Sequence, residues 1–265
     1  MTDPFDRTLP LGAPLPGSSF VDLLRSVGAE PKWDGAPSGS ELQVPEGTTV
    51  LALRYAGGVV IAGDRRATEG HLVAHRHIQK VFPADRYSAV AIAGTAGIAI
   101  EMIKLFQVEL EHYEKIEGTT LSLEGKANFL ARLVRNHLPM AFQGLVVVPL
   151  FAGYDSELET GRLFSYDAVG GRYEENDYGA TGSGSRLAKS YLRTAFRVDI
   201  DRDTAVSLAV NALVAAADED TATGGPDLIR GIFPNVFAID AEGLNETDES
   251  VVRAAAEQAI GGQQT

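Results

Sequence analysis

The sequence of 265 residues contains no cysteine. Thiol catalysis, disulfide bonds and metal sites built from thiolates are therefore excluded. Basic residues are scarce relative to acidic ones, with 23 Lys and Arg against 36 Asp and Glu. Because nucleic acids and anionic membranes attract positive charge, this balance argues against both as partners.

Long apolar segments are also missing. The longest run, residues 145–152, is interrupted by Pro149 and is far shorter than the roughly 20 residues that a membrane-spanning helix needs. The amino terminus lacks the basic start and the apolar stretch of a secretion signal. We therefore expect a cytoplasmic protein without membrane contact, which agrees with the absence of cysteine.

Several familiar catalytic and binding motifs are absent. No Gly-x-Ser-x-Gly elbow occurs, and the glycine-rich residues 182–185 lack the pattern of a phosphate or dinucleotide loop. Glu109 and His112 form a single Glu-x-x-His pair, whereas a di-iron bundle needs two, so a solvated helix face is expected. His75 and His77 alternate but have no third ligand nearby, so exposed loop histidines are expected. We expect neither a metal ion nor another cofactor.

The stretch that carries most information is Gly47-Thr48-Thr49. It separates a leader, which holds seven of the twelve prolines, from an alternating apolar segment. A leader of that composition is not expected to fold into the core of the domain that follows it. Cleavage after Gly47 would give Thr48 a free α-amine beside its own hydroxyl, so that one residue would supply both nucleophile and base. Residues 1–47 are therefore predicted to be a propeptide removed by self-cleavage, and residues 48–265 a single domain with a short flexible tail.

The segment after Thr48 predicts a β-hairpin. Residues 49–55 have the pattern of a strand, residues 56–58 that of a turn, and residues 59–64 that of a buried return strand. The hairpin is expected to bring Asp64 back to the strand end near Thr48. Lys80 follows in a charged, aliphatic segment.

Downstream, the apolar periodicity changes to that of helices. Two antiparallel helices are predicted over residues 99–113 and 127–138. Further strands are predicted at 146–154, 161–167, 171–173 and 233–240, and further helices at 185–196, 204–217 and 249–260. Helices inserted between runs of strands indicate a layered α+β fold.

The motifs Gly47-Thr48-Thr49, Gly63-Asp64-x-Arg66, Lys80 and Ala93-Gly94-Thr95-Ala96, in this order, resemble the β-subunit of the 20S proteasome in its actinobacterial form. The resemblance extends over nearly all of residues 48–260. It implies the four-layer αββα sandwich of the amino-terminal nucleophile hydrolases. It also implies a threonine endopeptidase that hydrolyses unfolded proteins after cleaving its own Gly47–Thr48 bond.

The resemblance also implies roles for individual residues. Thr48 is expected to be the nucleophile, with Asp64 and Lys80 as its charged neighbours. The other expected site residues are Ser183 and Asp220 close to the amine, Thr223 where many relatives carry a serine, Gly94 as the backbone oxyanion donor, and Arg66 as a structural neighbour.

Elementary acid–base chemistry is consistent with these roles. An α-amine has an unperturbed pKa of about 7.7–8.0, so it can accept the threonine proton near neutral pH. A positive charge on Lys80 disfavours protonation of the amine, and Asp64 would hold that lysine in place. In the precursor the same nitrogen belongs to an amide and cannot accept the proton.

Substrate preference follows from positions that match the specificity pocket of the family. These are Ala67, Ile78, Phe82, Ile92, Ala96 and Ile100, and none carries a charge. Such a lining favours apolar residues before the cut, because an acidic or basic side chain would be buried unpaired. Core packing explains Ile92 and Ile100 about equally well. Thr68 and Ala96 are expected to align the substrate backbone as an added strand.

The implied partners are proteasome α-subunit rings and other β-subunits, which form seven-membered rings stacked in pairs. An ATPase ring would deliver substrates marked by a small protein modifier. Two alternatives stay open: a non-catalytic ring subunit of the same fold, and a small-molecule amidase. Retention of Thr48, Asp64, Lys80 and the leader argues against the first, and particle size distinguishes the second.

Overall fold

The computed structural model describes residues 48–69 and 72–262. The expected propeptide with Gly47, and residues 263–265, lie outside the described residues. The strands are β1 (Thr49–Tyr55), β2 (Gly58–Gly63), β3 (Ala67–Glu69), β4 (Leu72–His75), β5 (Val81–Asp85), β6 (Ser88–Gly94), β7 (Val147–Asp155), β8 (Thr160–Tyr166), β9 (Arg172–Glu175), β10 (Tyr178–Gly182), β11 (Asn235–Asp240) and β12 (Gly243–Glu246). The helices are α2 (Ala96–Glu117), α3 (Leu123–Asn136), α4 (Leu138–Ala141), α5 (Ser185–Ala195), α6 (Arg202–Glu219) and α7 (Glu249–Gly262).

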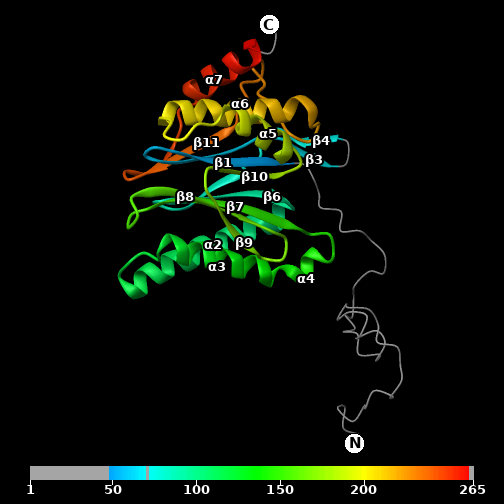
Figure 1. Ribbon diagram of the computed structural model, residues 1–265. Helices are drawn as coiled ribbons and strands as arrows, with labels where there is room; N and C mark the ends of the chain where they lie inside the picture. Colours follow the sequence, from blue (N-terminus) through cyan, green and yellow to red (C-terminus); the bar gives the residue numbers. More distant parts are fainter. Residues whose placement is uncertain (1–47, 70–71, 263–265) are drawn as a thin grey trace, which may run out of the picture. The chain divides into compact units, whose positions relative to one another are not determined.

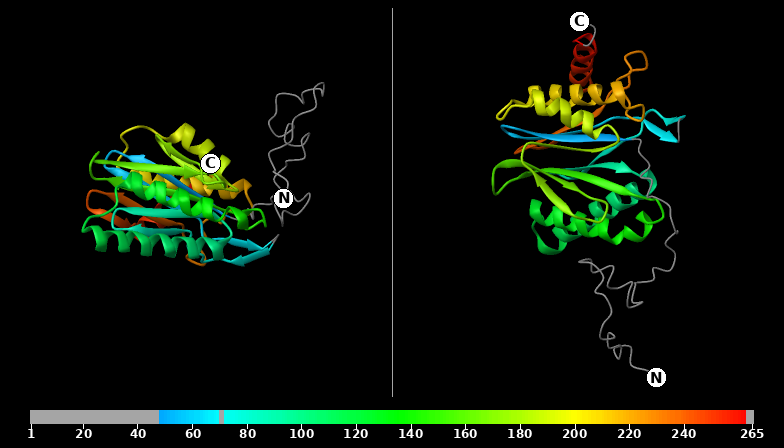
Figure 2. Two further views of the ribbon diagram at one scale, coloured as in Figure 1. Left: turned by 90° about the horizontal axis from the view of Figure 1, so that it is seen from below. Right: turned by 45° about the vertical axis from the view of Figure 1, so that its right-hand side comes forward.

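Two antiparallel five-stranded sheets lie face to face. The first has the order β10-β1-β2-β11-β12 and the second has the order β5-β6-β7-β8-β9, while β3 and β4 form a separate hairpin. Helices α5 and α6 cover the outer face of the first sheet, with α7 beyond them, and α2 and α3 cover the outer face of the second (Figure 1; Figure 2). The expected four-layer αββα sandwich is confirmed.

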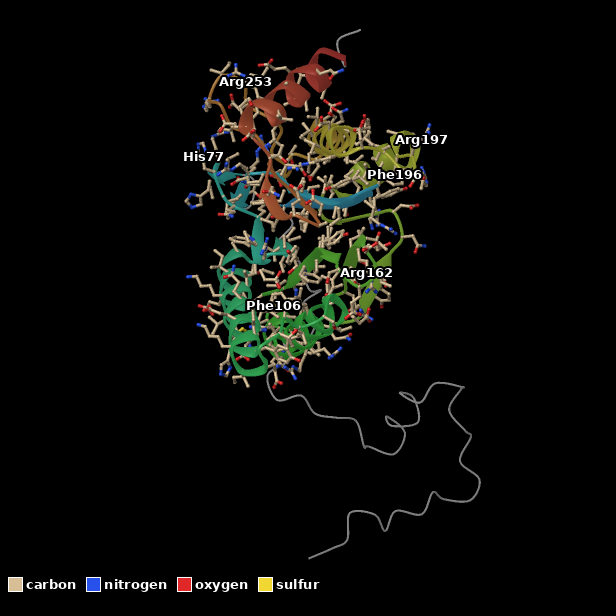
Figure 3. The ribbon with its side chains drawn as sticks, turned by 90° about the vertical axis from the view of Figure 1, so that its left-hand side faces the viewer. His77, Phe106, Arg162, Phe196, Arg197 and Arg253 are labelled. Carbon is tan, nitrogen blue, oxygen red and sulfur yellow. The ribbon has the colours of Figure 1, made fainter. Side chains whose placement is uncertain are left out.

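Each interface between layers has its own apolar core, because the strands of the first sheet are buried on both faces. Along β1, Leu51 and Leu53 point toward α6, whereas Val50 and Ala52 point toward the second sheet. Phe106 of α2 fills the third core and packs edge-to-face against a phenylalanine of β7, with ring centroids 6.0 Å apart (Figure 3). Alternate side chains therefore hold both neighbouring layers to one central strand.

The helices and long strands agree with the sequence predictions to within a few residues. One predicted helix stops earlier: α3 ends at Asn136, and Leu138 begins the separate short helix α4, with Pro139 in its first turn. The sequence pattern does not predict β3 to β6, β10 or β12. These strands are short, or rich in alanine and glycine, and they are stabilised by pairing with neighbours rather than by their own propensity.

Two predicted solvent-exposed sites can be compared directly. Glu109 and His112 are both exposed on α2, as expected of a solvated helix face. His75 and His77 are exposed too, but His75 is the last residue of β4, so its assignment to a loop is wrong. Among the residues that the structure describes, none of the helices has the length and apolar character that crossing a membrane requires.

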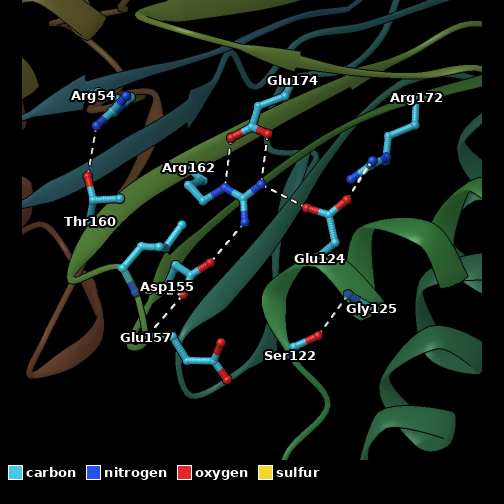
Figure 4. Close-up of polar contacts among 11 residues, drawn as sticks. Arg54, Ser122, Glu124, Gly125, Asp155, Glu157, Thr160, Arg162, Arg172 and Glu174 are labelled. Atoms are coloured by element: carbon cyan, nitrogen blue, oxygen red, sulfur yellow. Dashed lines mark hydrogen bonds and ion pairs between the residues drawn. The ribbon is translucent and has the colours of Figure 1, made fainter.

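Arg162 of β8 connects three elements on the side of the second sheet. Its guanidinium contacts Asp155 of β7 at 2.9 Å, Glu124 of α3 at 2.8 Å and Glu174 of β9 at 2.7 Å (Figure 4). Both Arg162 and Asp155 are largely buried, with side-chain exposures of 13% and 11%. This network ties α3 to three neighbouring strands.

Replacing Arg162 should destabilise the protein substantially. We expect Arg162→Met to lower the free energy of unfolding by about 2–3 kcal/mol, because Asp155 would lose its charged partner while the half-exposed glutamates can turn to water. Denaturant unfolding measures the change. Arg253→Met is the matched control, since Arg253 forms an exposed i,i+4 pair on α7 (Figure 3) and should cost less than about 0.5 kcal/mol. Equal effects of the two variants would contradict the assigned role.

The contribution of the network should also depend on pH. Hydrogen bonds from Arg162 lower the pKa of Glu174, and those from Arg172 and Arg162 lower the pKa of Glu124. Because the folded-state pKa values are depressed, the stabilisation is present above the unfolded pKa of about 4.3 and is lost as the pH falls through the folded values. The gap in stability between the parent and Arg162→Met should therefore narrow between neutral pH and about pH 3.5. A gap that stays constant or widens would contradict this.

Candidate active site

The predicted site residues gather at one edge of the first sheet. In the strand register, Thr49 lies opposite Gly182 of β10, and Val50 lies opposite Gly63 of β2. The start of β1 therefore lies beside the ends of β2 and β10. The hairpin returns Asp64 to this edge as predicted, and its N–H donates to the Thr49 carbonyl at 3.1 Å.

Asp64 and Lys80 form a buried ion pair, with 2.6 Å between Lys80 Nζ and Asp64 Oδ1. Lys80 precedes β5 of the second sheet, and its carbonyl accepts a hydrogen bond from Ile92 of β6. The pair therefore connects the two sheets. Its side chains are only 3% and 0% exposed.

The Asp64 carboxylate is saturated with donors. Oδ1 also accepts the N–H of Thr49 at 2.9 Å, and Oδ2 accepts the N–H groups of Arg66 at 2.9 Å and Gly224 at 2.8 Å. These four bonds replace the water that a carboxylate loses on burial. Arg66 thus lies beside Asp64, and its guanidinium is held by the Thr221 carbonyl at 2.9 Å.

Burial changes the acid–base behaviour of Lys80. Loss of solvation lowers the pKa of its ammonium, and the nearby Asp64 carboxylate opposes this shift without cancelling it. The lysine therefore gives up a proton more readily than one in water. A perturbed amine held next to a carboxylate is typical of catalytic centres.

Ser183, Asp220 and Thr223 form a second polar cluster at the same edge. The hydroxyl groups of Ser183 and Thr223 both donate to Asp220 Oδ2, at 2.6 and 2.5 Å. Burial alone would raise the pKa of Asp220, but these hydrogen bonds, together with two from backbone N–H groups, lower it overall. The carboxylate is therefore ionised at neutral pH.

Thr48 itself lies against this second cluster. It is 9% exposed, and its carbonyl accepts the N–H of Ser183 at 3.0 Å. Gly182, the preceding residue, has a φ of +99°, and a Cβ placed there would lie 1.7 Å from the Thr48 carbonyl oxygen. Glycine is required at this position for both reasons.

Gly94 stands where β6 gives way to α2. Its φ is +112°, and a Cβ there would lie 2.1 Å from the Val146 carbonyl oxygen. That same carbonyl accepts the N–H of Thr95 at 2.8 Å. The backbone turn at the expected oxyanion donor is therefore one that only glycine adopts without strain.

The residues expected to bind substrate come from β3, α2, β5, β6 and the segment after β4. Ala67 and Thr68 are half-buried in β3, and Ala96 and Ile100 are half-buried in the first turns of α2. Ile78, also half-buried, follows β4 and donates its N–H to the Arg65 carbonyl.

The other two expected pocket residues lie at one apolar core. Phe82 of β5 lies against the apolar core that contains Ile92 of β6. Ile92 is only 6% exposed, which agrees with a core position, whereas Phe82 is half-buried.

One residue of this site is not among the predicted site residues. Thr49 is fully buried, and its Oγ1 lies 2.6 Å from Thr223 Oγ1 and accepts the N–H of Gly184 at 2.9 Å. The signal in the sequence is a hydroxyl at the start of an otherwise apolar strand, where a buried polar side chain needs a partner.

In the described part of the chain, His, Asp and Glu do not gather into any group of three that could hold a metal ion. The polar groups that the structure does bring together are two carboxylates, one amine and several hydroxyls. Such groups exchange protons and activate a hydroxyl nucleophile.

Comparisons with known proteins identify the family of the chain. A family model described as proteasome subunit matches residues 44–229. The proteasome subunit beta of Acidimicrobium ferrooxidans is 57% identical over 235 residues, which is 89% of this chain and 86% of the relative. The proteasome subunit beta of Streptomyces griseus is 54% identical over 251 residues, covering 91% and 88% of the two chains. That of Acidothermus cellulolyticus is 53% identical over 250 residues, covering 92% and 86%. The chain therefore belongs to the proteasome subunit family, as one of its β-subunits.

Proposed function

We propose that the chain is a threonine endopeptidase whose nucleophile is Thr48, released by cleavage of the Gly47–Thr48 bond. The observation that carries this proposal is the position of Thr48 at the edge where the buried Asp64–Lys80 pair meets the Ser183–Asp220 cluster. The nucleophile, whose own free amine is the base, has a positive charge at the same edge and a backbone held in one orientation.

In the mature enzyme the Thr48 hydroxyl attacks the substrate carbonyl while the free α-amine takes its proton. The positive charge of Lys80 disfavours protonation of that amine, and Asp64 holds Lys80 in place. The Gly94 N–H donates to the developing oxyanion. The amine product leaves with the proton, and water then hydrolyses the ester bond to Thr48, which restores the free hydroxyl.

Self-cleavage uses the same nucleophile. The Thr48 hydroxyl attacks the Gly47 carbonyl, the Gly47–Thr48 amide becomes an ester, and water releases residues 1–47. The described side of this bond supports the step, since the Ser183 N–H holds the Thr48 carbonyl in place. The ionised Asp220 keeps the Ser183 side chain fixed beside it.

The proposed substrates are unfolded polypeptides, with apolar residues before the cut. The uncharged residues Ala67, Ile78, Phe82, Ala96 and Ile100 are half-buried, so they combine partial access with an apolar surface. An acidic or basic side chain bound among them would lose solvation without gaining a partner.

The proposed setting is a cytoplasmic 20S particle. Seven-membered β-rings would be stacked in pairs between α-subunit rings, and an ATPase ring would deliver tagged substrates. Membership of the proteasome family and the names of the relatives support assembly into rings. A non-catalytic subunit would not need the saturated Asp64–Lys80 pair, and a small-molecule amidase would not need the rings.

The intact mass of the chain, co-expressed with its α-partner, tests processing and nucleophile together. We expect the parent to begin at Thr48, and Thr48→Ala to keep residues 1–47 and to lose all peptidase activity. Thr119→Ala, at an exposed position between α2 and α3, is the control and should process normally. Normal processing or peptide hydrolysis by Thr48→Ala would overturn the proposal.

A panel of fluorogenic peptides tests the pocket. Turnover should be faster after Tyr or Leu than after Asp or Lys, by roughly 10-fold or more, because a charged side chain would be buried unpaired. Ala96→Asp should weaken hydrolysis after apolar residues while leaving Thr48 processed. Preference of the parent for acidic or basic residues would contradict the proposed lining.

A further inference from the structure

Thr49, to which neither the sequence analysis nor the proposed mechanism assigns a role, contacts both polar clusters. Its N–H donates to Asp64 Oδ1 at 2.9 Å, and its carbonyl accepts the Asp64 N–H at 3.1 Å. Its hydroxyl oxygen lies 2.6 Å from Thr223 Oγ1 and accepts the Gly184 N–H at 2.9 Å. The residue is 0% exposed, so no bulk water competes for these bonds.

The direction of each hydrogen bond follows from the ionised Asp220. A carboxylate can only accept, so both Ser183 and Thr223 donate to it. The Thr223 hydroxyl has then used its proton, so the Thr49 hydroxyl must donate to Thr223. Because Thr49 in turn accepts from the Gly184 N–H, its hydroxyl has a single orientation.

The backbone at Gly184 passes so close to the Thr49–Thr223 contact that no side chain fits there. A Cβ on Gly184 would lie 2.6 Å from Thr49 Oγ1 and 2.6 Å from Thr223 Oγ1. Any larger residue at 184 would push the two hydroxyls apart. The hydrogen-bond chain from Gly184 through Thr49 and Thr223 to Asp220 therefore depends on the residue type at each of these four positions.

The consequence for Thr48 depends on covalent connectivity. Once residues 1–47 are removed, as the proposed function requires, Thr48 is attached to the protein only through the Thr48–Thr49 peptide. We propose that Thr49 is a positioning residue whose buried hydroxyl fixes this peptide, so that the amine and hydroxyl of Thr48 stay aligned for attack. A displacement of about 1 Å at a reacting group lowers rates by about 100-fold.

The test removes the hydroxyl and keeps the shape. In the assembled particle, Thr49→Val should lower kcat by about 10- to 100-fold with KM unchanged, because the loss falls on alignment and not on substrate binding. Thr49→Ser keeps the hydroxyl and should restore kcat to near the parent value. A merely structural role would reduce the amount of particle but would not split kcat from KM in the particle that forms.

Two controls separate this inference from the proposed function. Thr247→Val deletes a buried hydroxyl that has no hydrogen-bond partner among the described residues, and it should leave kcat unchanged. Thr48→Ala, assayed in parallel, reports on the nucleophile itself. Parent-like kcat in Thr49→Val with an inactive Thr48→Ala would overturn the role of Thr49 alone, whereas an active Thr48→Ala would overturn the proposed function.

A second variant is needed if Thr49→Val does not assemble into the particle. Thr49→Ala, which lacks the added methyl of valine, then replaces it, and the same loss of kcat is expected. If neither variant assembles while Thr49→Ser is assembled and active, the hydroxyl serves folding alone and the proposal is overturned.

Discussion

The buried ion pair between Asp64 and Lys80 is the interaction on which the site depends. Two charges removed from water are stable only if their other hydrogen-bonding groups are satisfied. Asp64 meets this condition through three backbone N–H groups, which come from β1, from the residues after β2 and from the loop after α6. The Lys80 side chain extends from the second sheet to contact Asp64. The pair therefore forms only when both sheets and the α6 loop are in place, so the local chemistry requires the complete sandwich.

The second cluster has a different physical character. Asp220 is stabilised as a carboxylate by hydroxyl and backbone N–H donors, and it lies at the end of α6, where the loop can bring Thr223 back toward it. Thr49 is the residue at which the two clusters meet, because its backbone faces Asp64 and its side chain faces Thr223. Thr48 directly precedes Thr49, and its carbonyl accepts the Ser183 N–H.

Much of the fold can be predicted from the sequence because its elements are strongly periodic. The hairpin of β1 and β2 and the helices α2, α5, α6 and α7 each carry an apolar pattern long enough to identify them. The short strands β3, β4 and β12 carry no such pattern, and β10 contains two glycines among its five residues. Their extended conformation comes from hydrogen bonds to neighbouring strands, which a local reading of the sequence does not contain. The four layers likewise followed from a family resemblance and not from periodicity.

The sequence by itself determined which residue types were available, namely a threonine that cleavage can expose and no thiol, whereas the choice of Lys80 and Asp220 among many charged residues came from the family resemblance. Local spacing also placed Asp64 near Thr48, because a hairpin returns to its own start. Only the tertiary structure decided that Lys80 crosses from the other sheet and that Thr49 joins the Asp220 cluster, 171 positions further along the chain from it. Hydrogen bonds of this kind depend on how layers stack, and stacking is a property of the whole core rather than of any segment.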